Sequence, residues 1–227
     1  MLHFRKQVVA VICQGVVGAD RASETRGRIL EAAFELFAEK GFTGATTREI
    51  ADRADVNEVT IFRHFRSKEA LFQEGIELYS PVAILTAELQ ERLTGDDVRS
   101  NLAHLASQYL KAALPRAKVI HLGMTDAARN PELRRIVGQI PQRLEQHLTD
   151  YLFGLEGQGR IRQRDFALVA HLFYGMLFQH VLSSCGVPDC VRRSDIVDGD
   201  LAETLADLFS EYLRPEPAAS VPEGGTH

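Results

Sequence analysis

The stretch that decides the fold is "TTREIADRADVNEVTIFRHF", residues 46–65. Thr46 and Glu49 have the spacing of a capping box, in which a hydroxyl and a carboxylate each bind a backbone amide at a helix N-terminus. This spacing predicts a short helix over residues 47–54. After a brief break, Asn57 is a good N-cap for a second short helix. The stretch therefore predicts two short helices joined by a tight turn.

Two such helices have the layout of a helix-turn-helix, whose second helix enters the major groove of DNA. A small residue, Ala51, lies where the helices must cross, and Asp55 lies in the turn, where a positive φ is favoured. Val56, Ile61 and Phe65 are the apolar groups that would hold the second helix in place. The residues alone therefore predict a DNA-binding unit.

Outward from this unit, apolar residues recur with a period of 3.6 and alternation is scarce, so we expect an all-α fold. An amphipathic helix precedes the motif and ends at Gly41, and Ser67 caps a fourth helix that runs toward Pro81. We expect a three-helix helix-turn-helix domain followed by a larger helical domain. The later helices are predicted at 82–93, 97–114, 117–128, 132–153, 165–185 and 196–213. The predicted divisions are a flexible tail (1–22), the DNA-binding domain (23–68), a ligand-binding and dimerisation domain (69–213) and a disordered tail (214–227).

Composition limits the class of protein. The chain has 227 residues, 45% of them hydrophobic and 25% charged, which is ordinary for a globular protein. Its net charge of −5 argues against coating nucleic acid by bulk charge but permits a local basic patch. Three cysteines form no disulfide framework, which favours a cytoplasmic protein. We identify no apolar run of the roughly 18 to 20 residues that a membrane span needs. The first 20 residues resemble a weak signal peptide, which leaves secretion as an alternative.

The stretch "TRGRILEAAFELFAEKGFTGATTREIADRADVNEVTIFRHFRSKEALF", residues 25–72, resembles the N-terminal domain of the tetracycline-repressor-like (TetR/AcrR) family of bacterial transcriptional regulators. The rest of the chain matches that family only in helical layout. The resemblance implies contacts with phosphate, and in places with a base, from Thr47 and Arg48. It also implies phosphate or backbone contacts from Thr60, His64 and Lys68.

Two residues depart from the family pattern. Phe62 stands where tyrosine is common, so a phosphate-directed hydroxyl is missing, although the ring can pack on sugar or a thymine methyl. Glu58 lies early in the recognition helix, where a carboxylate either accepts from cytosine N4 or is an ordinary surface glutamate. Arg63 suits bidentate recognition of guanine. The complete predicted DNA-binding set is Thr47, Arg48, Asn57, Glu58, Thr60, Phe62, Arg63, His64 and Lys68.

One helix-turn-helix reads only a short stretch of DNA, so we expect a second subunit. The segment 165–185 is apolar almost all round. A helix that is apolar on two faces must be buried on both, one inside its own domain and one against another subunit. The resemblance implies that this helix and the last one form a four-helix bundle across a two-fold axis. The predicted dimer interface comprises Phe173, Leu177, Val181, Leu201, Leu205, Leu208 and Phe209.

The larger domain should also enclose a small-molecule pocket, which is mostly apolar with a few polar groups. The sequence does not identify the ligand. The candidate lining residues are His104, Tyr109, His121, Met124, His147, Tyr151, His171, Tyr174 and Met176.

Together these features predict a homodimeric repressor that binds a pseudo-palindromic operator in double-stranded DNA and is released by a small-molecule effector. Residues 68–80 would transmit the effector's signal. An alternative is a DNA-binding protein controlled by a protein partner without an effector. Sensing through His180, Cys185 and Cys190 is a weaker alternative, because their spacing matches no standard zinc site. The chain lacks the usual catalytic motifs, so we predict no enzymatic activity, no cofactor and no metal site.

Overall fold

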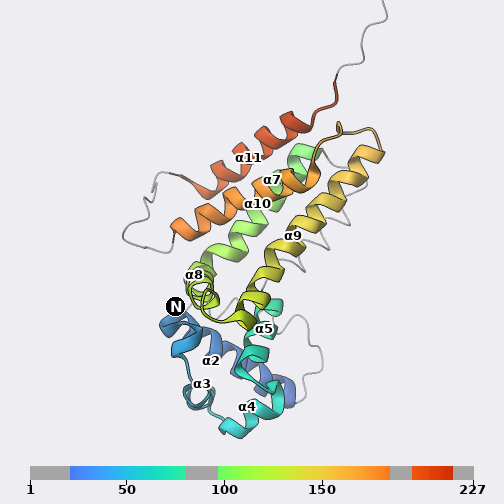
Figure 1. The fold of residues 1–227 in the computed structure, drawn as a ribbon. Coiled ribbons are helices and arrows are strands. Elements are labelled where there is room, and N and C mark those ends of the chain that lie inside the picture. The colour runs from blue at the N-terminus through green and yellow to red at the C-terminus, as the bar shows by residue number, and fades with distance from the viewer. Residues whose placement is uncertain (1–20, 80–96, 185–195, 217–227) are drawn as a thin grey trace, which may run out of the picture.

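The structure is a computed structural model that describes residues 21–79, 97–184 and 196–216. Within these ranges the regular structure is helical throughout, without strands, which confirms the predicted all-α fold (Figure 1). The predicted helix 82–93 lies outside the described residues. So does most of each predicted tail, although Arg21 and Ala22 belong to the first described helix.

The N-terminal region, which we call the head, contains four of the described helices, at the lower end of Figure 1. They are α2 (Arg21–Gly44), α3 (Thr47–Ala54), α4 (Glu58–Phe65) and α5 (Lys68–Tyr79). The φ of Gly41 is 77°, so the regular part of α2 ends at the predicted residue. A left-handed conformation at this point favours glycine because it has no Cβ.

The caps of the short helices are those predicted. Thr46 and Glu49 form the complete capping box of α3, and Asp55 ends this helix in the left-handed conformation with a φ of 51°. The Asn57 side chain accepts a hydrogen bond from the Val59 amide at 2.9 Å. The Ser67 hydroxyl accepts one from the Ala70 amide at 3.0 Å. Local side-chain chemistry therefore fixes where α3, α4 and α5 begin.

The core of the head is aromatic. Phe34, Phe37, Phe42 and Phe72 pack with ring centroids 5.2 to 5.8 Å apart, mostly edge to face. A Cβ on Gly75 would lie only 1.9 Å from Cε2 of Phe34, so glycine permits the close approach of α5 to α2.

The larger domain contains the remaining described helices. They are α7 (Val98–Ala113), the 3₁₀ turn η1 (Leu114–Arg116), α8 (Ala117–Ala127), α9 (Pro131–Gly157), α10 (Phe166–Ser183) and α11 (Asp198–Leu213). Helix α9 passes its predicted end at residue 153, because fully buried Leu155 continues its apolar stripe across the glycines that suggested a loop. The other predicted helix ends agree with the structure to within about two residues, as is usual for helix boundaries.

The two regions meet along α8 and the start of α9. Helix α8 packs on α2, and Asp126 Oδ2 accepts a hydrogen bond from the Thr43 amide at 3.1 Å. Leu133 and Ile136 of α9 are buried in the same cluster as the aromatic residues of the head. The head therefore shares its core with the larger domain.

Helix α10 is, among the described residues, the one helix that is long and apolar enough to meet the length and composition criteria of a membrane span. The sequence-based expectation that no such segment exists was wrong in this respect. One face of α10 lies in the core of the larger domain, and the core helix of a soluble protein passes the same test.

Candidate DNA-binding and effector sites

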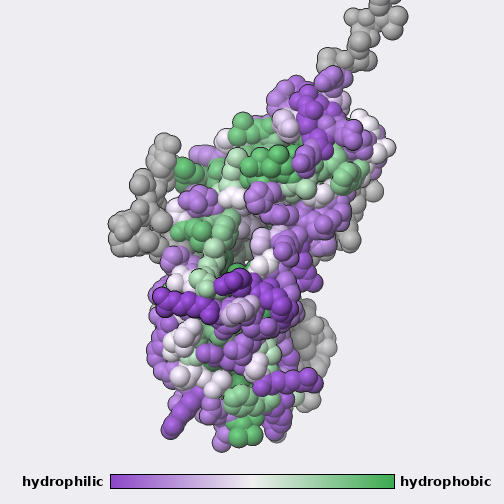
Figure 2. Space-filling model, in the orientation of Figure 1, coloured by the Kyte–Doolittle hydropathy of each residue, from purple (hydrophilic) through white to green (hydrophobic). Residues whose placement is uncertain are grey.

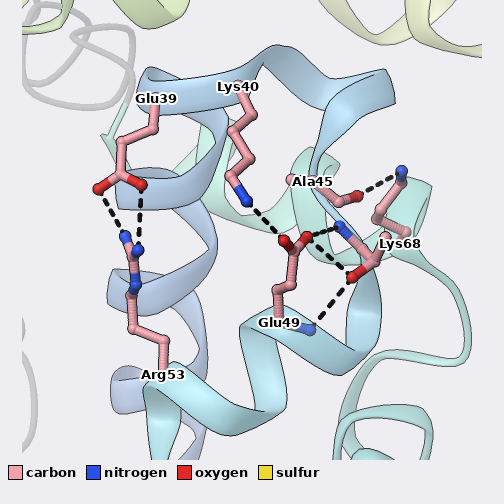
Figure 3. A network of polar contacts seen from close by, with 7 residues as sticks. Glu39, Lys40, Ala45, Glu49, Arg53 and Lys68 are labelled. Atoms are coloured by element: carbon pink, nitrogen blue, oxygen red, sulfur yellow. Dashed lines mark hydrogen bonds and ion pairs between the residues drawn. The ribbon is translucent and has the colours of Figure 1, made fainter.

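Helix α3 is held on α2 by ion pairs, which fixes the first half of the helix-turn-helix (Figure 3). The guanidinium of Arg53 binds the Glu39 carboxylate through two bonds of 2.7 and 3.0 Å. The Lys40 ammonium lies 2.5 Å from Glu49, which also closes the capping box of α3. These groups are partly exposed, so each pair stabilises the head modestly.

Glu49 is the most strongly perturbed carboxyl group of this network. The hydrogen bond from Lys40 and the bonds from the backbone and hydroxyl of Thr46 lower the pKa of Glu49 to about 2. The carboxylate is therefore ionised at neutral pH, as the capping box requires.

Helix α4 presents a mixed apolar and basic surface to solvent. Val59 and Phe62 are 73% and 46% exposed, and Arg63 is exposed beside them. Figure 2 shows this apolar surface at the lower tip of the molecule, where Figure 1 places α4. Arg48 on α3 is also exposed. The opposite face of α4 is buried through Ile61 and Phe65, as predicted.

Val59 is a candidate base contact that the sequence analysis missed. It lies three residues before Phe62, so both side chains share one face of α4. The available signal was an exposed β-branched residue in the first turn of the recognition helix. A valine methyl suits contact with the methyl group of thymine.

Thr47 and Glu58, both predicted to contact DNA, contact each other. The Thr47 hydroxyl donates to Glu58 Oε1 at 2.5 Å and joins the first turns of α3 and α4. Glu58 is half-buried. A carboxylate has further lone pairs, so this bond leaves Glu58 able to accept from a base while fixing its position.

Lys68 faces the protein rather than open solvent. Its ammonium donates to the carbonyls of Phe42 and Ala45 at 2.9 Å each and lies 4.4 Å from the centroid of the Phe42 ring. Burial lowers the pKa of Lys68. The geometry gives Lys68 a role in holding the turn between α2 and α3, and its contact with phosphate stays a prediction.

The remaining predicted contacts lie on or beside α4. Asn57 is exposed, and its side chain caps the helix. Thr60 and His64 are half-buried. Burial, followed by the charges of Arg63 and Arg26, lowers the pKa of His64 and favours the neutral imidazole, which can still donate one hydrogen bond.

Most of the predicted dimer residues fall on the inner stripe of α10 and α11. Four of them are buried in the core of their own domain and cannot meet a partner: Phe173, Leu177, Val181 and Leu205. Phe209 is also largely buried but lines the groove described below. Leu201 is partly buried against the same core, whereas Leu208 is 58% exposed. The error arose because both stripes of α10 are apolar, so periodicity could not identify the inner one.

The second stripe of α10 forms an exposed apolar groove with α11. We call it the α10–α11 groove, and Figure 2 shows the apolar surface at this level. Leu172, at its centre, is 44% exposed. The groove is lined by Asp165, Leu168, Val169, Leu172, Met176, Leu208, Phe209 and Tyr212.

The predicted pocket residues divide by burial. Tyr109, Tyr151 and Tyr174 are buried, and His104, His121 and His147 are half-buried. Met124, His171 and Met176 are exposed, so they do not lie in the buried core of the domain. Their spacing placed them on apolar helices but not on the inner face. His171 Nδ1 lies 3.0 Å from Glu145 Oε1, and Met176 lines the α10–α11 groove.

Of the three candidate sensor residues, the structure describes His180 alone. His180 Nε2 lies 2.8 Å from Asp198 Oδ1. Cys185 and Cys190 lie outside the ranges that the structure describes.

Comparison with known proteins identifies relatives of this chain. Residues 29–74 match the family described as "Bacterial regulatory proteins, tetR family", and residues 100–188 match "AefR-like transcriptional repressor, C-terminal domain". The HTH-type transcriptional regulator YvkB of Bacillus subtilis (strain 168) is 30% identical over 167 residues, 74% of this chain and 86% of that one. The regulator UidR of Escherichia coli (strain K12) is 27% identical over 180 residues, 78% and 90% of the two chains.

Solved structures share the fold. One assigned as a TetR-family transcriptional regulator of Mesorhizobium loti MAFF303099 superposes with a TM-score of 0.71 at 24% identity, covering 86% of this chain and 100% of its own. Fold, helix-turn-helix and relatives agree, and the chain belongs to the TetR family of helix-turn-helix transcriptional regulators.

Proposed function

We propose that this regulator is a cytoplasmic repressor that binds a pseudo-palindromic operator as a homodimer and leaves it when a small molecule binds the larger domain. The observation that carries the proposal is the exposed face of α4, with Val59, Phe62 and Arg63 on a head whose other side chains cap and clamp its helices. In functional terms, residues 23–68 read DNA and residues 69–213 bind the effector and the partner. The flanking tails are residues 1–22 and 214–227.

On this proposal, the exposed side chains of the head divide into two kinds. Arg63 and Arg48 bring positive charge to the surface, Arg63 as a guanine reader and Arg48 mainly as a phosphate contact. Val59 and Phe62 pack on thymine methyls or sugars. Thr60 and His64 contact phosphate, and Glu58 accepts from a cytosine while Thr47 holds it in place.

The α10–α11 groove is the surface that we assign to the second copy of the chain. It is apolar, exposed, and formed by the two helices that end the described fold. A helix-turn-helix dimer needs two heads about 34–36 Å apart on a two-fold axis. An isologous contact through this groove supplies such an axis, because each copy offers the same surface.

Two routes are available for effector control. Helix α5 packs on α2 at Gly75, and α8 contacts the turn that follows α2 through Asp126. A ligand that binds two arrangements of the larger domain with different affinities would shift α8 and α5, and with them the separation of the two heads.

The test has three parts on the full chain. Genomic fragments selected by the protein should share an inverted repeat with half-sites about one helical turn apart. Sedimentation at micromolar concentration should give a dimer, and one dimer should bind one repeat. A single half-site bound by one subunit would contradict the dimeric proposal, and a bound ligand that leaves operator affinity unchanged would contradict effector control.

A further inference from the structure

Asn101 is an unusual residue of the core of the larger domain. Among the described residues, and apart from tyrosines, the only buried polar or charged side chains are Asn101, which is 1% exposed, and Thr149. The Asn101 Nδ2 donates to the Tyr151 hydroxyl at 2.7 Å. Its Oδ1 has no hydrogen-bond partner, so half of this buried amide is unsatisfied.

Tyr174 presents a second unpaired atom in the same core. Its side chain is 4% exposed and its hydroxyl has no hydrogen-bond partner. Its ring packs on that of Tyr109, with 5.6 Å between the centroids. Burial raises the pKa of both tyrosines, so both hydroxyls are neutral at physiological pH.

Unpaired buried groups are rare because each loses its bonds to water without replacement. Such a group costs about 1–3 kcal/mol, and native proteins satisfy most of them. The larger domain has three such atoms among the described residues, Nε of Arg164 being the third, and the two on Asn101 and Tyr174 lie in its core. Two unpaired groups in one core indicate that stability is sacrificed there to another requirement. Binding of a molecule that forms hydrogen bonds with both groups is such a requirement.

Further polar side chains of the domain, His104, Gln108 and His147, are half-buried. His104 and Gln108 follow Asn101 by three and seven residues, so the three lie on one side of α7. His147 precedes Tyr151 by one turn on α9 and is half-buried. Among the described residues, no acidic or basic side chain is buried. An ion placed in this core would lack a counter-charge, and burial of an unpaired ion costs far more than burial of a hydroxyl or amide.

We propose that the effector of this regulator is an uncharged, mainly apolar molecule. Its hydroxyl or amide groups form hydrogen bonds with Asn101 Oδ1 and with the Tyr174 hydroxyl. This inference rests on the ligand control proposed above. Asn101 Oδ1 accepts, so the effector offers a hydrogen there, whereas the hydroxyl of Tyr174 can donate or accept. Tyr109, the neighbour of Tyr174, lies eight residues from Asn101, about 12 Å along α7, which favours an elongated ligand.

The first test needs no ligand. Tyr174→Phe removes an unpaired hydroxyl, so it should raise the folding equilibrium constant of the full chain about fivefold or more in urea denaturation. Tyr151→Phe is the matched control, because it removes the partner of Asn101 and should lower that constant by a similar factor. A Tyr174→Phe variant that is equal to or less stable than the parent would overturn the proposal.

The second test fixes the chemical class with three probes that share a biphenyl skeleton. They are the phenol biphenyl-4,4′-diol, which has one hydroxyl for each unpaired group, biphenyl-4-carboxylate and 4-phenylbenzylammonium, measured by calorimetry at pH 7. The phenol should bind at least about tenfold more tightly than either ion, and Tyr174→Phe should weaken it by about tenfold, as expected for a lost buried hydrogen bond. Absence of phenol binding, equal binding of either ion, or an unchanged Tyr174→Phe variant would each overturn the proposal.

Measuring operator affinity in the presence of each probe distinguishes a failure of this inference from a failure of the proposed function. Phenol binding that Tyr174→Phe abolishes, with operator affinity unchanged, supports the neutral site and contradicts effector control. Release of the operator by a charged probe, with no response to the phenol, supports effector control and overturns the neutral site.

Discussion

The head and the α10–α11 pair bury their apolar residues by different means. In the head, capping groups, ion pairs and a glycine contact each specify one arrangement, as with Thr46 and Glu49 or Gly75 and Phe34. Helix α10 has two apolar stripes and almost no polar side chain to distinguish them. This difference shows that the periodicity of apolar residues identifies a buried helix but not which of its faces points into the core.

The largest expected effect is inside the head, where α5 packs on α2. In Gly75→Ala the new Cβ would lie 1.9 Å from Phe34 Cε2, so α5 must move away from α2. We expect a loss of about 3 kcal/mol in the free energy of unfolding, measured in urea, since overpacking of this kind displaces backbone. The control is Gly138→Ala in α9, where nothing lies within 4 Å. It should raise stability by about 0.5–1 kcal/mol, and equal behaviour of the two variants would refute the close contact.

The next prediction asks which stripe of α10 meets a partner. Leu172→Glu places a carboxylate at the centre of the α10–α11 groove, and burial of an unpaired charge opposes association. We expect a folded monomer in sedimentation and a loss of operator affinity of about 100-fold or more, because the second head no longer binds on the same molecule. Leu78→Glu, at an exposed leucine of α5, should remain dimeric. A dimeric Leu172→Glu protein would show that the contact lies elsewhere.

A smaller effect is expected within the reading surface. Arg63→Ala should cost about 1–3 kcal/mol of operator affinity and relax the preference for one base, if its guanidinium binds guanine. Binding to a set of operators with single substitutions measures both quantities. Arg143→Ala, at an exposed arginine of α9, serves as the control and should bind as the parent does. Equal weakening on every operator would identify Arg63 as a phosphate contact.

The smallest effect concerns pH. The pKa of Glu49 is lowered to about 2 in the folded protein, from an ordinary value of 4.5. Its contribution to stability is therefore fully present above pH 4.5 and is lost as the pH falls toward 2. The parent should lose more stability over this interval than Glu49→Gln, as followed by thermal unfolding at a series of pH values. Parallel curves would show that the pairs with Lys40 and Thr46 add nothing in solution.

The sequence predicted the head closely because its signals are local. Thr46, Asp55, Asn57 and Ser67 act within three or four residues, and the structure places each of them as predicted. The Thr47–Glu58 bond and the inward turn of Lys68 depend on how separate helices pack, so the sequence did not reveal them.

In the larger domain the sequence identified the helices but not their orientation. Phe173 and Leu172 are adjacent and both apolar, yet one is fully buried and the other exposed. The packing of α10 against α9, α7, α8 and α11 decides between them. Asn101 was missed for the opposite reason, because a lone asparagine in a helix gives no periodic signal.

The hydrogen bond between the Thr43 amide and Asp126 has a consequence for chimeric regulators. It joins positions 83 residues apart, and beside it a Cβ on Gly41 would lie 2.9 Å from the same carboxylate oxygen. A foreign DNA-binding head fused to this larger domain must therefore bring a glycine and a free amide to this turn. Without them, the fusion would bind its operator and its ligand as two independent modules.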